Sequence, residues 1–318
     1  MELVALKDMM PTGRQQYPVE EWSEKLRGIC GRFQPMPVEA SRLVTGAPAM
    51  MLAGGLELAC IANDLDVIRR DRQDIRADYG ESLFLLLQLE GVCGIEQYGR
   101  QSIIAPGDCI LVDSASPSVF HFGGRFSNHL SVHLPRQIML SAGAVRFEVS
   151  RRLMAGDPMA AMLRALVAKL AGTDADDRRA PPLRQLLFDA TRQAFAADDQ
   201  GDRARPSDSA SGRLDVVQIL IDRHLTDEQL TPQWLADRVG ISLRTLQDDF
   251  STLGTTATSL IRARRLHLAR DRLRQVRPAD DGLSIAEIAY SSGFNDISYF
   301  NRCFKRAFDC SPRDLLPH

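Results

Sequence analysis

Residues 231–250 read TPQWLADRVGISLRTLQDDF and contain the signals of two short helices joined by a glycine turn. Thr231 is a favourable N-cap, Pro232 suits the first helical position, and Gly240 suits the left-handed residue just past a helix end. Ser242 is the N-cap of a second helix, which continues to residue 250. A helix, a tight turn and a second helix form a helix-turn-helix motif.

The same pattern recurs in residues 284–306, which read SIAEIAYSSGFNDISYFNRCFKR. Ser284 and Glu287 form a capping box, Gly293 ends the first helix, and Phe294 plugs the turn. A second helix then runs to residue 306. The chain therefore contains two helix-turn-helix units, about 231–250 and 284–306.

A long amphipathic helix is predicted between the two motifs, with its core side formed by Leu260, Leu266, Ala269 and Leu273. The bulk charge says little about nucleic acid, because the net charge is -2 and residues 213–318 hold 15 Lys and Arg against 14 Asp and Glu. Local charge is better evidence. Around this helix a single acid, Asp271, stands among seven arginines, which are Arg262, Arg264, Arg265, Arg270, Arg272, Arg274 and Arg277.

These motifs resemble the AraC/XylS family of bacterial transcription regulators over roughly residues 213–318. The resemblance rests on Ser-x-Arg-x-Leu-x-x-x-Phe at 242–250, Arg-Leu-x-x-Ala-x-x-x-Leu at 265–273, Ile-x-x-Ile-Ala-x-x-x-Gly-Phe at 285–294, Ser-Tyr-Phe-x-Arg-x-Phe-Lys at 298–305 and Ser-Pro at 311–312. In that family both recognition helices enter successive major-groove turns on one face of DNA. The resemblance thus implies two contacts about one helical turn, roughly 34 Å, apart.

The resemblance assigns DNA contact to the outward residues of both recognition helices. These are Ser242, Arg244, Gln247 and Asp248 on the first helix, and Ser298, Asn301, Arg302, Lys305 and Arg306 on the second. Arginine can grip guanine, glutamine and asparagine can pair with adenine, and the terminal basic pair can hold phosphate. The alternative for any one of them is that it merely solvates a helix face.

Two positions depart from the family pattern. Asp248 and Asp249 lie on a helix that should approach a polyanion, where an acid near phosphate is repelled. Asp309 and Cys310 stand where the family more often has glycine before Ser-Pro, which predicts a slightly different helix end.

The N-terminal part reads as many short strands from Trp22 to about Leu134, which favours an antiparallel barrel or sandwich. The turn Pro106-Gly107-Asp108 and the strand after it resemble the cupin-like sensor domain of the same family, most closely its FeaR/XylS-type variant. Effectors of that variant are aromatic acids, aldehydes or amines. The fold class is therefore α+β: an N-terminal cupin-like antiparallel β-barrel with flanking helices, and an all-α C-terminal domain with two helix-turn-helix units.

A barrel of this size can hold one small ligand, with alternate residues of each strand pointing inward. The candidate lining residues are Phe84, Leu86, Gln88, His121, Phe122, His129 and His133. The alternative is that most of them are ordinary core or surface residues. His129 and His133 would share one strand face, but the compact His-x-His with a following Glu of metal cupins is missing, so no metal, cofactor or catalytic residue is assigned.

The sequence predicts a sensing and dimerisation domain at 1–197, a linker at 198–212 and the DNA-binding domain at 213–318. Amphipathic helices after residues 158 and 182 either cap the barrel of their own chain or form a homodimer contact. The N-terminus lacks secretory-signal features and no apolar run is long enough to span a membrane, which favours a cytoplasmic location.

The function predicted is sequence-specific control of transcription, as an activator, by a homodimer. Its predicted partners are promoter DNA, RNA polymerase and a small effector, with aromatic compounds among the candidates. Two alternatives stay open: a metal-dependent cupin enzyme with a helix-turn-helix tail, and a DNA-binding dimer that needs no ligand.

Overall fold

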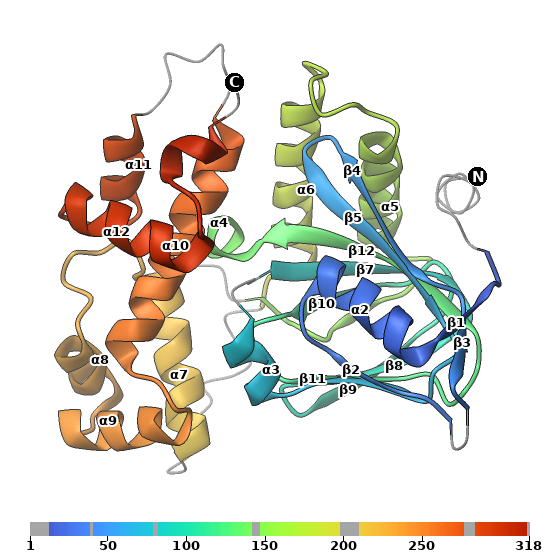
Figure 1. The fold of residues 1–318 in the computed structure, drawn as a ribbon, viewed down its shortest axis with the longest axis horizontal. Coiled ribbons are helices and arrows are strands. Elements are labelled where there is room, and N and C mark those ends of the chain that lie inside the picture. The colour runs from blue at the N-terminus through green and yellow to red at the C-terminus, as the bar shows by residue number, and fades with distance from the viewer. Residues whose placement is uncertain are drawn as a thin grey trace. The chain divides into compact units, whose positions relative to one another are not determined.

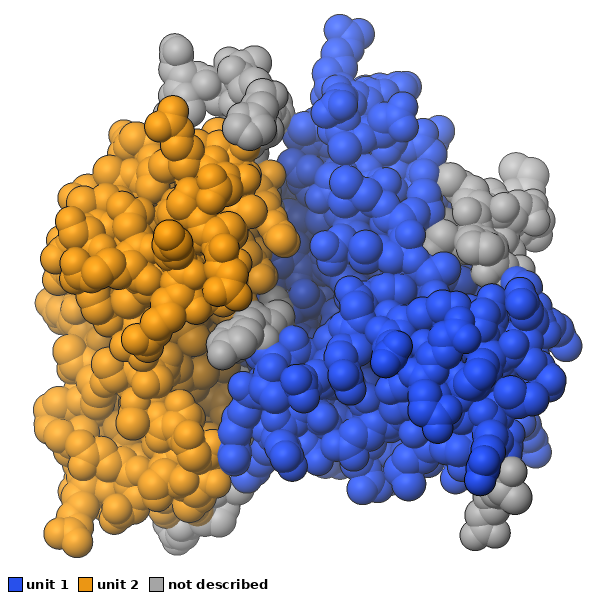
Figure 2. All heavy atoms as spheres, viewed as in Figure 1, with its two compact units in different colours: residues 1–136, 146–197 blue, residues 137–145, 198–318 orange. Residues whose placement is uncertain are grey.

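The computed structural model describes residues 13–38, 41–78, 82–141, 147–197, 210–276 and 284–316. The chain divides into two units, which are residues 1–136 with 146–197 and residues 137–145 with 198–318 (Figure 2). In the described ranges no helix is both long and apolar enough to cross a membrane. The predicted linker lies outside the described residues up to residue 209, and its last three residues are helical instead, because helix α7 already begins at Ala210.

Unit 1 is built from antiparallel sheets (Figure 1). The larger sheet has the order β13 (Arg152–Leu153), β10 (Cys109–Asp113), β7 (Ser82–Glu90), β12 (Ser127–Pro135), β5 (Leu56–Asn63) and β4 (Pro48–Ala53). The second sheet has the order β2 (Gln34–Met36), β6 (Val67–Arg70), β11 (Ser118–His121), β8 (Cys93–Gln97) and β9 (Arg100–Ile104). A short third pair joins β1 (Gln16–Pro18) to β3 (Leu43–Thr45).

The core of unit 1 lies between the two larger sheets. Ile61 and Leu86 from the six-stranded sheet belong to one buried cluster with Ile95 and Phe120 from the five-stranded sheet. Residues 83–87 of β7 form an unbroken apolar run because both faces of the strand are buried there, as expected for a sheet covered on both sides. The prediction of an α+β fold with an antiparallel, cupin-like barrel is confirmed.

Helices α5 (Pro158–Ala171) and α6 (Ala180–Ala194) pack beside this sheet (Figure 1). Arg184 of α6 donates from Nη1 to the carbonyl oxygen of Gly54 in the β4–β5 turn, 2.9 Å away. The apolar stripe of α5 is buried, whereas Met162 and Leu186 remain 41% and 56% exposed. The buried side chains of these helices are therefore covered within their own chain, by the other helix of the pair and by the barrel.

The N-terminal segment corrects the sequence prediction of strands from Trp22 onward. Residues Val19–Cys30 form helix α2, because Trp22 and Leu26 stand one helical turn apart and are both buried. The Trp22 Nε1 donates to the carbonyl oxygen of Ala62 at 3.2 Å and ties the helix to β5. A second unpredicted helix, α3 (Arg72–Ala77), begins at a capping box formed by Asp71 and Asp74.

In the residues that the structure describes, the regular elements of unit 2 are helices joined by turns and loops. Its helices are α4 (Arg136–Ser141, from residue 137), α7 (Ala210–Arg223), α8 (Pro232–Val239), α9 (Leu243–Thr252), α10 (Ala257–Gln275), α11 (Ile285–Ser291), α12 (Ile297–Phe308) and the 3-10 turn η1 (Pro312–Leu315). Helix α10 serves two cores: Ile261 and Leu268 pack with α7, α8 and α9, while Leu266 and Leu273 pack with α11 and α12 (Figure 1). One continuous helix thus fixes the spacing of the two motifs.

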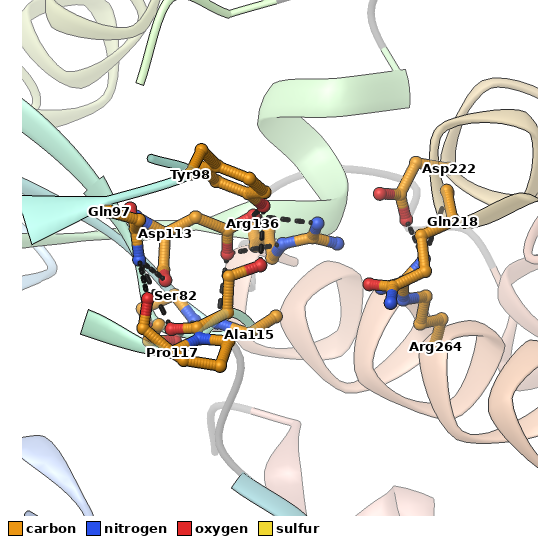
Figure 3. A network of polar contacts seen from close by, with 12 residues as sticks. Ser82, Gln97, Tyr98, Asp113, Ala115, Pro117, Arg136, Gln218, Asp222 and Arg264 are labelled. Carbon is orange, nitrogen blue, oxygen red and sulfur yellow. Dashed lines mark hydrogen bonds and ion pairs between the residues drawn. The ribbon is translucent and has the colours of Figure 1, made fainter. Parts of the chain in front are cut away.

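The arginines of α10 correct the interpretation of local charge. Arg264 is 1% exposed, with its Nη1 at 2.7 Å from Asp222 Oδ1 and its Nη2 near Gln218 Oε1 (Figure 3). Arg265 donates to the carbonyl oxygens of Leu225 and Asp227, which ties α10 to the segment after α7. Arg262 contacts Tyr299, Arg270 contacts Asp271, and Arg272 contacts Ser291. Much of this cationic cluster therefore holds the domain together, and Arg277 lies outside the described residues.

Candidate nucleic-acid interface and ligand cavity

The first helix-turn-helix is built from the capping signals read in the sequence. Thr231 Oγ1 accepts from the Trp234 amide at 3.1 Å, and Ser242 Oγ accepts from the Thr245 amide at 3.0 Å. Gly240 has φ 75°, in the left-handed region that favours glycine. The predicted helix, turn and recognition helix, α8 and α9, are confirmed.

The second helix-turn-helix repeats this design. The Ser284 amide donates to Glu287 Oε2 at 2.6 Å and the Glu287 amide donates to Ser284 Oγ at 3.2 Å, which completes the predicted capping box. The hydrogen bond from the Ser284 amide, followed by that from the Ser284 side chain, lowers the pKa of the Glu287 carboxyl. Asp296 caps α12 by accepting from the Tyr299 amide at 2.9 Å. Gly293 has φ 89° in the turn between the two helices.

Every residue that the sequence assigns to DNA contact is exposed. On α9 and its cap these are Ser242, Arg244, Gln247 and Asp248, and on α12 they are Ser298, Asn301, Arg302, Lys305 and Arg306. On α9, Gln247 and Asp248 stand three and four residues after Arg244, and on α12 the residues after Ser298 recur at the same spacings, so each helix presents one stripe. Among the described residues, no acid forms an ion pair with any of these basic side chains. The Ser242 hydroxyl differs from the rest, because it is already engaged in capping α9.

One of the two unexpected acids is removed from the interface by the fold. Asp249 is 5% exposed and accepts from Arg213 Nε at 2.8 Å and from Arg213 Nη2 at 2.7 Å. Asp249 therefore joins α9 to α7, and Asp248 alone of the pair faces outward. The exposed stripe of α9 carries one cation and one anion, whereas that of α12 carries three cations. Phosphate attraction should consequently be stronger at α12.

The departure at the end of α12 is also visible. Asp309 is the C-cap residue and has φ 54°, a left-handed conformation that is unfavourable for a residue with a side chain. The helix nevertheless ends there with the Asp309 amide donating to the Lys305 carbonyl oxygen at 2.9 Å. The residue type at this position therefore differs from the family pattern, but the backbone of Asp309 has the left-handed conformation that glycine favours.

The core of unit 1 contains a cavity of about 30 Å³. Its walls come from α2, both larger sheets and the segment after α2, and its lining residues are Leu26, Cys30, Phe33, Ile61, Ile68, Phe84, Leu86, Phe120, His129 and Ser131. The sequence predicted Phe84, Leu86 and His129. It missed the α2 wall, which the four-residue spacing of Trp22 and Leu26 could have indicated.

Four predicted lining residues lie outside the cavity walls. His121 is exposed, with Nε2 at 3.2 Å from Glu96 Oε1, because it alternates along β11 with the buried Phe120. Gln88 is buried, and its amide donates to Ser127 Oγ at 2.8 Å. Phe122 packs in the core, with its ring stacked 6.5 Å from that of His129. His133 is buried, with Nδ1 at 3.3 Å from Glu57 Oε2 and Nε2 at 3.7 Å from Cys30 Sγ.

A polar network holds the end of β12, the strand that carries His129 and Ser131. Arg136 donates from Nε to Asp113 Oδ1 at 2.8 Å and from Nη2 to Asp113 Oδ2 at 2.9 Å, and both side chains are buried (Figure 3). Gln97 Nε2 donates to the Asp113 carbonyl oxygen at 2.8 Å. The network therefore joins Arg136, which follows β12, to Asp113 at the end of β10. Arg136 is the last residue of the first segment of unit 1.

Comparison with known proteins decides the identity. Residues 29–197 match the family described as AraC-binding-like domain, and residues 235–317 match the helix-turn-helix domain family. The chain belongs to the AraC family of transcriptional regulators. It pairs a ligand-binding type of N-terminal domain with a DNA-binding domain, and the resemblance read from its motifs is confirmed.

The chain is similar to several known proteins. This AraC-family chain is 30% identical over 268 residues to the transcriptional activator NphR of Rhodococcus sp, a match that covers 81% of this chain and 77% of NphR. It is 32% identical over 110 residues to the transcriptional activator RhrA of Rhizobium meliloti (strain 1021), covering 35% of this chain and 34% of RhrA. The solved AraC-like transcriptional activator CuxR aligns with TM-score 0.46 at 16% identity over 80% of this chain and 94% of CuxR.

The metal-dependent alternative gains no support from the described residues. Within them, no three His, Cys, Asp or Glu side chains are grouped so that they could hold a metal ion. The relatives named above are transcription regulators.

Proposed function

We propose that this AraC-family regulator is an activator that binds promoter DNA as a dimer through α9 and α12 and responds to a small effector in its barrel. The proposal rests on two recognition helices that each present an exposed stripe of polar side chains from one domain. NphR and RhrA are both described as transcriptional activators, which supports activation as the direction of control.

The DNA-binding step is tested with two arginine substitutions and a matched control. Arg244→Ala and Arg302→Ala each remove an exposed side chain from a recognition helix, and each should weaken operator binding by about 1–3 kcal/mol, or about 5- to 150-fold. Arg178→Ala removes the same charge from an exposed loop of unit 1 and should leave affinity unchanged. Wild-type affinity in both recognition-helix variants, measured by electrophoretic mobility shift, would reject the assignment.

The salt dependence of binding gives a second readout. Each phosphate neutralised contributes a slope of about -0.9 to the plot of log affinity against log salt concentration. Because Lys305 and Arg306 are exposed at the end of the α12 stripe, their joint replacement by alanine should reduce the slope by about two. An unchanged slope would contradict phosphate contact by these residues.

Effector control requires that the ligand binds one state of the regulator better than another. Footprinting on the DNA that flanks the protein's own gene, with and without small aromatic compounds, tests this requirement. Protection altered by one compound supports the proposal. Occupancy and transcription that stay constant across the compounds would favour a DNA-binding dimer that needs no ligand.

The partners follow from this role. An activator bound at a promoter acts on RNA polymerase. The activator and RNA polymerase then both act in the cytoplasm of a bacterium. The exposed Met162 and Leu186 of α5 and α6 support the dimer contact, since they are the large apolar side chains that these helices leave in solvent. Leu186→Lys should shift the sedimentation coefficient toward a monomer, and an unchanged value would exclude this face as the dimer contact.

A further inference from the structure

The cavity of unit 1 contains two polar groups with no hydrogen-bond partner among the described residues. These are His129 Nδ1 and Ser131 Oγ, in side chains that are 5% and 2% exposed. Both belong to β12 and stand two residues apart, so they lie next to each other on one strand face. A buried polar group left unpaired costs about 1–3 kcal/mol, which a ligand with matching groups would recover.

The rest of the lining is uncharged. Among the residues that the structure describes, no Lys, Arg, Asp or Glu side chain lines the cavity. Burial lowers the pKa of His129 to about 4 and raises that of the Cys30 thiol to about 12, so both are neutral near pH 7. The charged groups that act on Cys30 are Glu57, Arg70 and Asp78, of which Arg70 and Asp78 pair with each other at 2.9 Å. A charged ligand would therefore lose its hydration without gaining a counter-ion.

Three phenylalanine rings share the apolar part of the walls with four aliphatic side chains. Phe33, Phe84 and Phe120 line the cavity, and the ring of His129 stacks on that of Phe120 at 6.4 Å with an interplanar angle of 9°. Flat rings stacked in this way favour a flat aromatic guest. The walls thus combine aromatic stacking surface with a single polar spot.

The cavity must widen before it can bind an aromatic ring. A cavity of about 30 Å³ holds about one water molecule, whereas a cavity of roughly 150 Å³ accepts benzene. The walls formed by strands are fixed by backbone ladders, but α2 contributes Leu26 and Cys30 from outside the sheets. Its first residue also has no side-chain cap, because Pro18 stands at the N-cap position. Widening at the α2 wall therefore leaves the strand ladders intact, but it must take place beside the anchor that Trp22 Nε1 makes to the Ala62 carbonyl oxygen.

We propose, resting on the effector-controlled function above, that the barrel binds a small uncharged aromatic compound whose single hydroxyl group hydrogen-bonds to His129 and Ser131. A phenolic hydroxyl donates one hydrogen bond and accepts another, which matches an imidazole nitrogen and a serine hydroxyl. The ring then occupies the space between the phenylalanines. Binding opens the cavity by moving α2.

Isothermal titration calorimetry of the full chain near pH 7 tests this ligand class. Four probes of similar size separate the effects: para-cresol, toluene without the hydroxyl, benzoate with a negative charge and benzylamine with a positive charge. We expect para-cresol to bind at least about fivefold more tightly than each of the others, since one net hydrogen bond contributes about 1 kcal/mol, or about fivefold, and an unpaired buried charge is penalised more strongly. Benzoate should gain affinity by about tenfold per unit as pH falls, because the bound form must be neutral.

Variants identify the polar spot. Ser131→Ala should weaken para-cresol binding by about 5- to 10-fold, and His129→Phe should do the same. Ser118→Ala is the matched control, because Ser118 Oγ is also buried and unpaired but lies outside the cavity. Thermal unfolding shows whether each variant is folded, and Ser131→Ala should be at least as stable as the wild type because it removes an unpaired hydroxyl.

The outcomes separate this inference from the proposed function. Tighter binding of benzoate or benzylamine than of para-cresol near pH 7 would overturn the inference. So would unchanged para-cresol affinity in Ser131→Ala, or no binding of para-cresol at millimolar concentration, in which case the cavity serves a buried water. Binding of para-cresol as expected, with no effect on DNA occupancy or transcription, would uphold the inference and refute effector control by that ligand.

Discussion

Replacing each of the two turn glycines by alanine separates backbone strain from steric exclusion in a matched pair. Gly240 and Gly293 occupy equivalent turns and have φ values of 75° and 89°. A left-handed residue with a side chain costs about 1–2 kcal/mol. A Cβ on Gly240 would meet nothing within 4 Å, so Gly240→Ala should lose that amount and no more.

Gly293→Ala should be more damaging. A Cβ there would lie 2.6 Å from Arg265 Nε and 2.9 Å from the Leu225 carbonyl oxygen, two atoms that are hydrogen-bonded to each other at 2.8 Å. The added carbon must displace this contact, and a hydrogen bond from a charged group contributes about 1.5–3 kcal/mol. Together with the backbone strain, the loss should be about 3–5 kcal/mol.

Hydrogen–deuterium exchange of the full chain measures both losses locally. The free energy of opening should fall for peptides of α8 and α9 in Gly240→Ala, and more strongly for peptides of α11 and α12 in Gly293→Ala. Peptides of unit 1 provide the internal control. Equal losses in the two variants, or a larger loss in Gly240→Ala, would refute the argument from the Arg265 contact.

Three further predictions follow from single contacts. Asp249→Asn should lower the unfolding free energy by about 3 kcal/mol because it breaks a largely buried ion pair with Arg213, whereas Asp248→Asn should have little effect; equal urea midpoints would contradict this. Asp309→Gly should raise the unfolding free energy by about 1 kcal/mol by relieving the left-handed backbone, and a lower thermal midpoint would be inconsistent with it. Burial lowers the pKa of His129 to about 4, so the unfolded state binds a proton at a higher pH than the folded state does. The contribution of His129 to stability is therefore full above the unfolded pKa and falls as pH drops toward about 4, by up to about 1.4 kcal/mol per pH unit. His129→Phe should flatten this decline in the unfolding free energy.

The sequence predicted those features that depend on neighbouring residues. Thr231, Ser242 and Ser284 cap helices because a cap needs only the amides two or three residues ahead. The left-handed turns at Gly240 and Gly293 are local for the same reason. Exposure of the recognition stripes followed from helical spacing alone.

Features that depend on distant partners could not be predicted in this way. The sequence predicted that Asp249 would repel phosphate. In the structure Asp249 instead pairs with Arg213, which lies 36 residues earlier. Arg264 was counted with the local cluster of arginines, yet it is buried and forms an ion pair with Asp222. The error at His121 was avoidable, since the neighbours His121 and Phe122 were both predicted to line the barrel, and alternation along a strand excludes two adjacent inward side chains.

Selection of binding sites from a random DNA pool tests the central claim most directly. With the wild-type chain, the selected sequences should share two conserved blocks whose centres lie about 10 base pairs, one helical turn, apart. Arg244→Ala should lose conservation in one block and Arg302→Ala in the other, since each arginine belongs to a different recognition helix. Selected sequences without two such blocks, or with the same block lost in both variants, would contradict an account in which α9 and α12 each read DNA.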